Sequence, residues 1–160
     1  MYKVLSKIIV VFLFVNLTLQ SFGALKIDRD SVKINKNRLK VVIIGEASTW
    51  ATTLYLLNKE WYAGYPRSSF HFFNDTREWL FMDKTGHAMT SYYAGKFGIN
   101  ILTWAGASPK QAIWYGGFVG SMYLLNIELL DGFSSEWGFS IGDFSANTFG
   151  SLLCISQQLA

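Results

Sequence analysis

The sequence has little that could form disulfides, bind metals through thiolates or interrupt helices. Its 160 residues include one cysteine, Cys154, and two prolines, Pro66 and Pro109. A single cysteine excludes an intrachain disulfide and a cysteine-based metal cluster. Charged residues make up 16% of the chain, whereas an ordinary soluble domain has roughly 25%. This low charge, with 51% hydrophobic residues, favours a protein that contacts a membrane.

Basic residues are also missing from the end of the chain. No lysine or arginine follows Lys110, although four acidic residues do. Six basic residues instead fall within residues 26–40, and we interpret residues 25–38 as a solvated basic arm. A nucleic-acid-binding domain is expected to carry a basic stripe on its folded surface. We therefore predict that nucleic acid is not a partner.

The start of the chain, residues 1–24, has the pattern of a signal peptide. Lys3 and Lys7 precede an apolar stretch from Ile8 to Leu19, and small residues follow it up to a predicted cleavage site between Gly23 and Ala24. An uncleaved anchor helix is the alternative, but this stretch is shorter than the roughly 20 residues that span a bilayer. The pattern predicts an exported protein of the cell envelope, periplasmic or membrane-associated.

The remaining chain, residues 39–160, is predicted to be an all-α domain, a small membrane-associated helical bundle. Hydrophobic periodicity and capping residues predict helices at 39–58, 84–104, 109–131 and 140–160. An aromatic connector, residues 59–82, separates the first two. The third helix has the best-marked start, because Ser108, Pro109 and Gln111 fit a capping box with proline at the first position. At 1.5 Å per residue it would be about 33 Å long, the thickness of a membrane.

Small residues recur at four-residue spacing on two of these helices. They are Gly116 and Gly120 on the third, and Gly142, Ala146 and Gly150 on the fourth. Such spacing lets helix backbones approach closely. We predict helix–helix association through these residues, with Gly120 at a close contact. The chain stops at Ala160 without a capping residue, which we interpret as the truncation of a longer protein.

Polar residues lie near the ends of otherwise apolar helices, in three pairs at helical spacing. The pairs are Asp83 and His87, Glu128 and Asp131, and Asp143 and Asn147, with Lys84 beside the first. Polar groups in such surroundings are costly and usually face a bundle interior. We predict that they form one cluster, with His87 as the nearest cation for Glu128. Such a cluster could bind a divalent cation, relay protons or activate water, but no motif identifies a cofactor.

Structural interpretations of the same residues remain open. Asp83 could cap the helix that begins at residue 84, and Asp143 could complete a capping box with Ser140. Asp75, followed three residues later by a glutamate, could cap a short helix in the connector. His87 could be a core histidine whose hydrogen bonds are satisfied.

The order of these motifs resembles a known family. Asp83-Lys84-x-x-His87, Glu128-x-x-Asp131 and Ser140-x-x-Asp143-x-x-x-Asn147-x-x-Gly150 resemble the YfiM family of predicted periplasmic lipoproteins, over roughly residues 70–153. The sequence departs from that description because no cysteine lies directly after the predicted signal peptide, where a lipid would be attached. A fainter similarity links the chain to VanZ-like membrane proteins. Both resemblances imply a compact helical domain whose motif residues face one another.

Three functions fit these observations. The first is a non-enzymatic envelope module that binds a membrane lipid or an envelope protein, or has a structural role. The second is a membrane-embedded enzyme that acts on an envelope lipid or glycan precursor through its His, Glu and Asp residues. A small transporter or ion-binding protein would use the same polar residues.

Overall fold

The computed structural model describes residues 33–76 and 78–160. The signal peptide predicted for residues 1–24 lies outside the described residues, as do residues 25–32 of the predicted basic arm. Within the described part the chain is mostly helical, with two strands of two residues each. The prediction of a helical fold without an extensive sheet is confirmed for these residues.

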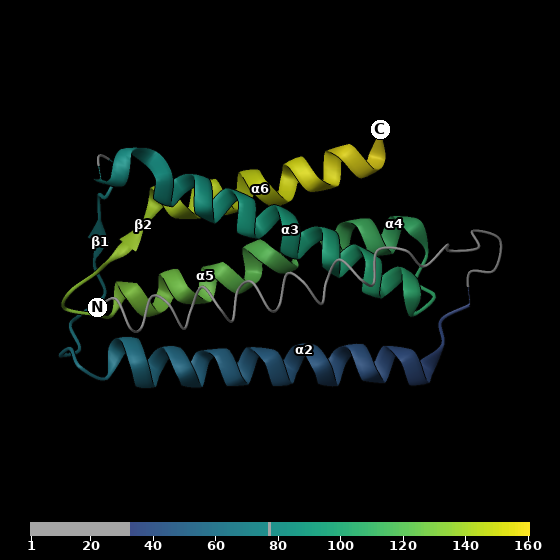
Figure 1. The fold of residues 1–160 in the computed structure, drawn as a ribbon, viewed down its shortest axis with the longest axis horizontal. Coiled ribbons are helices and arrows are strands. Elements are labelled where there is room, and N and C mark those ends of the chain that lie inside the picture. The colour runs from purple at the N-terminus through teal and green to yellow at the C-terminus, as the bar shows by residue number, and fades with distance from the viewer. Residues whose placement is uncertain (1–32, 77) are drawn as a thin grey trace. The chain divides into compact units, whose positions relative to one another are not determined.

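Four helices of at least fourteen residues account for most of the described structure (Figure 1). Short turns and a pair of strands connect them. The long helices are α2 (Lys36–Leu57), α3 (Met82–Trp104), α5 (Val119–Gly132) and α6 (Ile141–Leu159). The short elements are a π-helical turn (Asn58–Tyr62), β1 (Phe72–Phe73), a 3₁₀ turn (Glu78–Phe81), α4 (Pro109–Gln111), a second π-helical turn (Ala112–Gly116) and β2 (Phe139–Ser140).

Helix α2 begins three residues earlier than predicted, within the segment we expected to be a polar arm. Asn35 causes this, because its side-chain oxygen accepts hydrogen bonds from the backbone N–H groups of Asn37 and Arg38, at 3.1 Å each. These bonds satisfy donors that the first helical turn leaves free. No residue of α2 is buried.

Helix α3 also starts earlier than expected, at Met82, and Asp83 is not its N-cap. The preceding residue, Phe81, has a left-handed backbone with φ of 62° and caps the helix without a side-chain hydrogen bond. Asp83 lies instead in the first turn. There it is free to contact other side chains while still facing the positive end of the helix dipole.

The predicted helix over residues 109–131 is not one continuous helix. Its capping box is confirmed, with the Ser108 hydroxyl and the Gln111 side chain each bonding the other's backbone N–H. The helix is then interrupted by the π-helical turn and resumes at Val119. Adjacent glycines at 116 and 117 lower the cost of this interruption. The prediction of a single helix as long as a membrane is thick was therefore wrong.

Among the described residues, no helix combines the length and the hydropathy that crossing a bilayer requires.

Glycines bring α3, α5 and α6 into backbone contact. The prediction for Gly120 is confirmed, because a side chain there would collide with the backbone of Ser91. Gly150 lies equally close to the backbone of Ala88. Two glycines of α3 that we did not single out, Gly95 and Gly98, pack on the Gly116-Gly117 pair. These contacts show that the small-residue faces join helices of the same chain.

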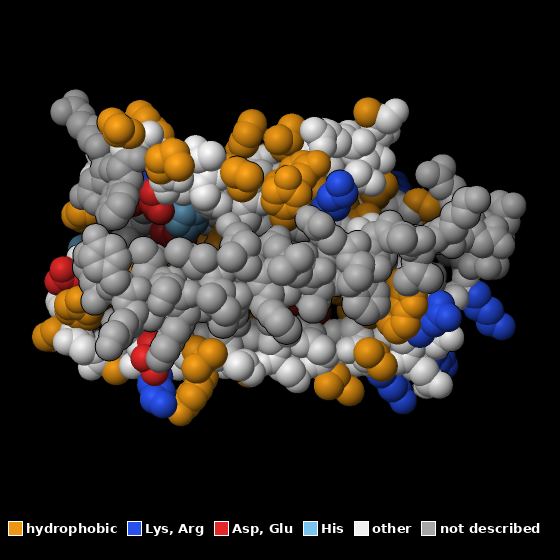
Figure 2. Space-filling model, in the orientation of Figure 1, with side chains coloured by type: hydrophobic (Ala, Val, Ile, Leu, Met, Phe, Trp, Pro, Cys, Tyr) orange, Lys and Arg blue, Asp and Glu red, His pale blue; other side chains and the backbone are white. Residues whose placement is uncertain are grey.

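Helices α3, α5 and α6, which we call the helix unit, bury many polar side chains beside a few apolar ones such as Ile99, Leu124 and Ile155, while many large apolar side chains are exposed. Buried side chains include Ser91, Asn147, Ser151 and Cys154. Exposed ones include Leu80, which is 90% exposed, together with Phe72, Phe149 and Leu152. Figure 2 shows hydrophobic side chains standing on the surface over α3 and α6. Large apolar side chains are therefore exposed on several elements of the described structure.

Candidate functional site

The predicted polar residues converge at the end of the helix unit where α3 and α6 begin and α5 ends (Figure 1). Asp83, Lys84 and His87 lie in the first two turns of α3, and Asp143 and Asn147 in those of α6. Glu128 and Asp131 lie near the end of α5. Figure 2 shows acidic and histidine side chains together near this end. We refer to Asp75, Asp83, Lys84, His87, Glu128, Asp143 and Asn147 as the polar cluster.

Lys84 binds three carboxylates of the polar cluster. Its Nζ lies 2.7 Å from Asp143 Oδ1, 2.8 Å from Asp75 Oδ2 and 3.1 Å from Asp83 Oδ2. Burial alone would lower the pKa of Lys84, but the bonds to the three carboxylates outweigh it and raise the pKa. For Asp75, burial raises the pKa, and the bonds from Lys84 and Ser140 reverse this into a net lowering. Lys84 is therefore a permanent cation that joins the connector to α3 and α6.

The Asp75 side chain, which we considered as the cap of a short helix, contacts Lys84 of the polar cluster and Ser140. Its Oδ2 pairs with Lys84, and its Oδ1 accepts a 2.7 Å hydrogen bond from the Ser140 hydroxyl. The local turn is held instead by Asn74, whose side chain accepts from the backbone and hydroxyl of Thr76. A carboxylate in an aromatic connector has no helical periodicity, so spacing alone could not connect Asp75 with Ser140, which lies much later in the chain.

His87 lies between the other members of the polar cluster. Its Nδ1 is 3.1 Å from Asn147 Oδ1 and 3.8 Å from Glu128 Oε1. Its Nε2 is 3.7 Å from Asp83 Oδ1 and 3.9 Å from Asp143 Oδ1. The ring is 20% exposed, so solvent reaches the site from this side. The histidine thus has one nitrogen facing an amide and the other facing two carboxylates.

Glu128 is the most buried carboxylate of the polar cluster, at 2% exposure. Its shortest contact is with the backbone, because Oε2 accepts a 3.2 Å hydrogen bond from the Ser140 N–H. Burial, together with the charge of nearby Asp143, raises the pKa of Glu128 to about 8, although the Ser140 hydrogen bond acts in the opposite direction. Glu128 therefore carries a proton at neutral pH, and its burial is accommodated by proton uptake more than by an ion pair with His87.

Ser140 and Asp143 divide the capping role differently from our prediction. The Ser140 hydroxyl accepts from the Asp143 backbone N–H at 3.1 Å, as expected of an N-cap. The Asp143 side chain, however, does not return to the Ser140 N–H, which donates to Glu128 instead. Burial raises the pKa of Asp143, although the Lys84 bond acts against this. Asp143 is thus directed towards Lys84 and His87.

Asp131 lies at the margin of the site, in contact with the connector. Its Oδ1 accepts a 2.6 Å hydrogen bond from the Tyr62 hydroxyl. Burial raises the pKa of Asp131 to about 6 despite this bond. Both Glu128 and Asp131 sit at the C-terminal end of α5, where the helix dipole disfavours negative charge, whereas Asp83 and Asp143 sit at helix starts. The four carboxylates are therefore not equivalent.

A chain of hydrogen bonds extends from the polar cluster into the core. The Ser91 hydroxyl donates to the Asn147 carbonyl at 2.6 Å and lies 2.9 Å from the Ser151 hydroxyl. Ser121 adds bonds to the same carbonyl and to Ser151. The sequence did not mark these serines as functional residues, because none has a catalytic base at the spacing of a known nucleophile motif. In the structure they connect α3, α5 and α6 at the point where glycine brings the backbones together.

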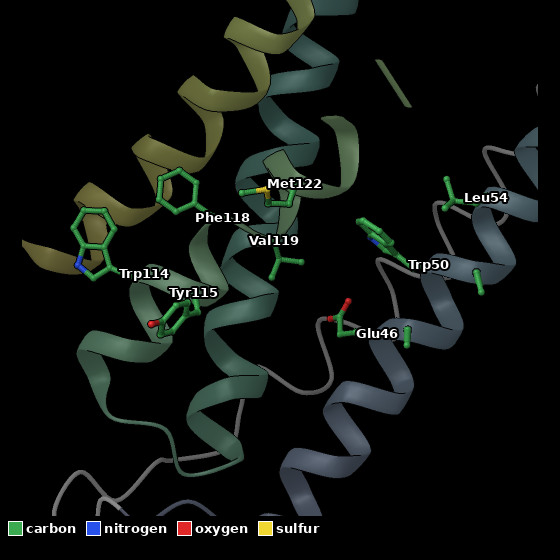
Figure 3. A pocket seen from close by; sticks show the side chains of 10 residues that line it. Glu46, Trp50, Leu54, Trp114, Tyr115, Phe118, Val119 and Met122 are labelled. Atoms are coloured by element: carbon green, nitrogen blue, oxygen red, sulfur yellow. The ribbon is translucent and has the colours of Figure 1, made fainter. Parts of the chain in front are cut away.

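A groove lies elsewhere in the molecule, between α2 and the α5 side of the helix unit (Figure 3). Its volume is about 700 Å³. Trp50 and Leu54 line it from α2, and Phe118 and Met122 from the opposite side, with Glu46 at its edge. Burial raises the pKa of Glu46. The groove has no residue in common with the polar cluster.

Comparison with known families gives one match. A family model described as "Predicted periplasmic lipoprotein (DUF2279)" covers residues 71–157. The matched region contains the entire polar cluster, the helices α3 and α5, and α6 up to residue 157, but not α2. No curated protein and no solved structure matches the chain.

The matched description names a lipoprotein, so we asked whether the single cysteine, Cys154, could carry a lipid. Cys154 is 1% exposed and packs in the core with Ile99 and Ala112. A lipid attached to its thiol would displace this packing, so Cys154 is a core residue. The match covers more than half of the chain, and the chain therefore belongs to the DUF2279 family of predicted periplasmic lipoproteins, proteins of the cell envelope.

Proposed function

We propose that this protein is a non-enzymatic envelope module that binds the membrane surface, with α2 as its main lipid-contacting element. The observation that carries the proposal is the exposure of α2. This helix has no buried residue, yet Val41, Ile43 and Ile44 are 58–65% exposed. A helix that exposes large apolar residues is expected to be covered by another apolar phase in its working state.

The attachment of α2 to the rest of the described structure supports this role. Its start is held by a hydrogen bond from Asn35 N–H to the Ala105 carbonyl, at 2.9 Å, and by Arg38, whose guanidinium donates to the Trp104 carbonyl at 3.1 Å. Its middle meets α5 through the rings of Trp50 and Tyr123, whose centroids are 6.1 Å apart. These few contacts leave most of the helix surface available to lipid.

The test is flotation of the full-length protein with vesicles of phosphatidylethanolamine and phosphatidylglycerol. The variant Ile43→Gln/Ile44→Gln removes two exposed apolar side chains while keeping good helix formers. Each buried isoleucine contributes about 1.5–3 kcal/mol, so we expect binding to fall roughly ten-fold or more. Wild type and variant are identical outside these two positions, so a difference between them in vesicle binding is due to α2.

A matched control changes the adjacent exposed pair on α6, Leu152→Gln/Leu153→Gln. If both double variants lose binding equally, α2 has no special role. If neither loses binding, while the wild-type protein co-purifies with another envelope protein, a protein partner replaces lipid in the proposal.

The alternative function, an enzyme acting on an envelope lipid or glycan precursor, is favoured by one observation. His87 Nε2 faces two carboxylates at 3.7 and 3.9 Å, and the nearby Glu128 keeps a proton at neutral pH. This combination suits general acid–base catalysis. The resemblance of the motif residues to those of YfiM and VanZ-like proteins is part of the support for this alternative proposal. Incubation with labelled envelope lipids would show turnover by the wild type and none by His87→Gln if the alternative is correct.

A further inference from the structure

We propose that Asp83, His87 and Asp143 bind one divalent transition-metal ion, and that Zn²⁺ is the ion their chemistry fits best. The inference goes beyond membrane binding and does not depend on it. The three residues come from two helices, with Asp83 and His87 four residues apart on α3 and Asp143 in the first turn of α6.

The spacing of the donor atoms suits one ion. His87 Nε2 lies 3.7 Å from Asp83 Oδ1 and 3.9 Å from Asp143 Oδ1, and one donor atom from each residue lies within 4.8 Å of the others. Donors around a tetrahedral zinc ion are about 3.3 Å apart, because each bond is about 2.0–2.1 Å long. Small rotations of the two carboxylates would bring the donors to that separation.

Asn147 holds the His87 ring in the orientation that metal binding needs. The amide oxygen lies 3.1 Å from Nδ1, and this acceptor favours the tautomer with the proton on Nδ1. The lone pair of Nε2 then points towards Asp83 and Asp143. Metal-binding histidines commonly use their second nitrogen in this way.

Two buried polar atoms without hydrogen bonds, one on Asn147 and one on Asp143, give a second, independent indication of a ligand. Asn147 is 1% exposed, and its Nδ2 has no hydrogen-bond partner among the residues that the structure describes. Buried donors of this kind are rare. The second such atom is Asp143 Oδ1, a buried acceptor without a hydrogen bond that faces His87 Nε2 at 3.9 Å.

The charges around the site match a divalent ion. Three carboxylates, from Asp75, Asp83 and Asp143, contact one ammonium group, that of Lys84. Two negative charges therefore remain for an ion to balance. Lys84 uses Oδ2 of Asp83 and leaves Oδ1 facing His87. Asp143 Oδ1, although 2.7 Å from Lys84, makes no well-directed hydrogen bond.

The donor set selects the type of ion. One imidazole nitrogen with two carboxylate oxygens suits zinc and similar transition metals, whereas calcium and magnesium prefer oxygen ligands alone. The exposed sides of His87 and Asp83, 20% and 42%, provide a path by which the ion enters. Because Lys84 lies in contact with Asp83 and Asp143, the ion would have an ammonium group beside its ligands.

The test is calorimetric titration of Zn²⁺ into the full-length protein after treatment with a chelator. We expect one ion per chain. His87→Ala should bind at least about ten-fold more weakly, and Asn147→Leu about ten- to a hundred-fold more weakly, the usual range for a residue that supports a ligand. The matched control is His71→Ala, which removes the only other histidine in the sequence. The His71 ring contacts Ser68 and Ser69 instead of the polar cluster. The His71→Ala variant should therefore bind Zn²⁺ with the same affinity as the wild type.

Two further measurements keep the test decisive. The absorption spectrum with Co²⁺ in place of Zn²⁺ should show a nitrogen–oxygen ligand field that His87→Ala loses and His71→Ala keeps. Melting curves measured in chelator show whether each variant is folded. If His87→Ala is not folded, His87→Gln replaces it in the Zn²⁺ titration. The proposal is overturned if wild type binds no Zn²⁺, if folded His87 variants bind it unchanged, or if His71→Ala weakens binding as much as His87→Ala.

Discussion

Helix α2 and the unit formed by α3, α5 and α6 are built in opposite ways. In the three-helix unit, backbones touch through glycines, and buried hydroxyl and carboxyl groups form hydrogen bonds to the backbone and to other hydroxyls. Helix α2 has no buried residue and is attached through a few hydrogen bonds and ring contacts. The family model covers the first and leaves out the second.

The difference shows what holds each part in place. Small residues and interhelical hydrogen bonds are how helices associate when their outer surfaces do not face water, because apolar burial between helices then contributes little. The three-helix unit contains its own cohesive contacts in this form. Helix α2 has fewer such contacts, made by Asn35, Arg38 and Trp50, and its exposed apolar side chains make no internal packing that a substitution would remove. Changes inside the unit should therefore affect folding, and changes on α2 should affect binding.

The largest effect is expected where two backbones touch. Gly120→Leu would place a side chain against the Ser91 backbone, whose Cα lies 2.7 Å from the added Cβ. A backbone cannot move aside as a side chain can, so we expect a loss of about 1–3 kcal/mol in the free energy of unfolding. Denaturant unfolding followed by circular dichroism measures it.

The control for this prediction is Gly86→Leu, on α3. A Cβ added at Gly86 meets nothing within 4 Å, so the same substitution should be neutral or stabilise, since leucine forms helices better than glycine. Equal destabilisation by the two substitutions would show that glycine is not needed for helix contact.

The next effect is a dependence on pH at the edge of the unit. Burial raises the pKa of Asp131 to about 6, from an ordinary value of 3.8. The folded state therefore binds this proton more tightly than the unfolded chain does, and its contribution to stability is lost as pH rises from about 4 to about 6. Asp131→Asn keeps an acceptor for Tyr62 and abolishes the titration. The variant should gain about 1–2 kcal/mol relative to wild type between pH 4 and pH 7, allowing for partial exposure.

A second variant tests the cause of this pH dependence. The Tyr62 hydrogen bond holds the pKa of Asp131 down, so Tyr62→Phe should move the loss of stability to higher pH. Unfolding free energies measured across pH 4–8 give both results. A constant difference between wild type and Asp131→Asn over this range would contradict the raised pKa.

Much of the difference between α2 and the three-helix unit could be predicted from the sequence. Where the sequence-based predictions failed, the physical causes can be identified. The helices of the unit follow from hydrophobic periodicity, and the members of the site share helical spacings, as with Asp83 and His87. Sequence reasoning missed Asp75 because a connector residue has no periodicity that relates it to Lys84. It also predicted one helix over residues 109–131, because the cost of a break at Gly116 and Gly117 depends on the helix that packs against them.

A smaller effect is expected from the buried serines. Ser91→Ala removes the hydroxyl that donates to the Asn147 carbonyl, but Ser121 still donates to that carbonyl. No acceptor is left unpaired, so the free energy of unfolding should fall by about 1 kcal/mol, the net contribution of an ordinary hydrogen bond. Ser145→Ala is the control, because that hydroxyl is exposed and bonds only the preceding turn. A loss at Ser145 as large as at Ser91 would contradict the role of the buried network.

The smallest effect on folding is expected on α2, and it separates the two regions most directly. Ile43 and Ile44 are 58% and 65% exposed, so changing both to glutamine removes no internal packing. Surface substitutions of this kind usually change stability by less than about 0.5 kcal/mol. The double variant should therefore unfold like wild type in solution while binding vesicles less well, measured on the same preparation. If its unfolding free energy falls as far as that of Gly120→Leu, these isoleucines pack against the protein itself, and α2 belongs to the folded unit instead of forming its binding surface.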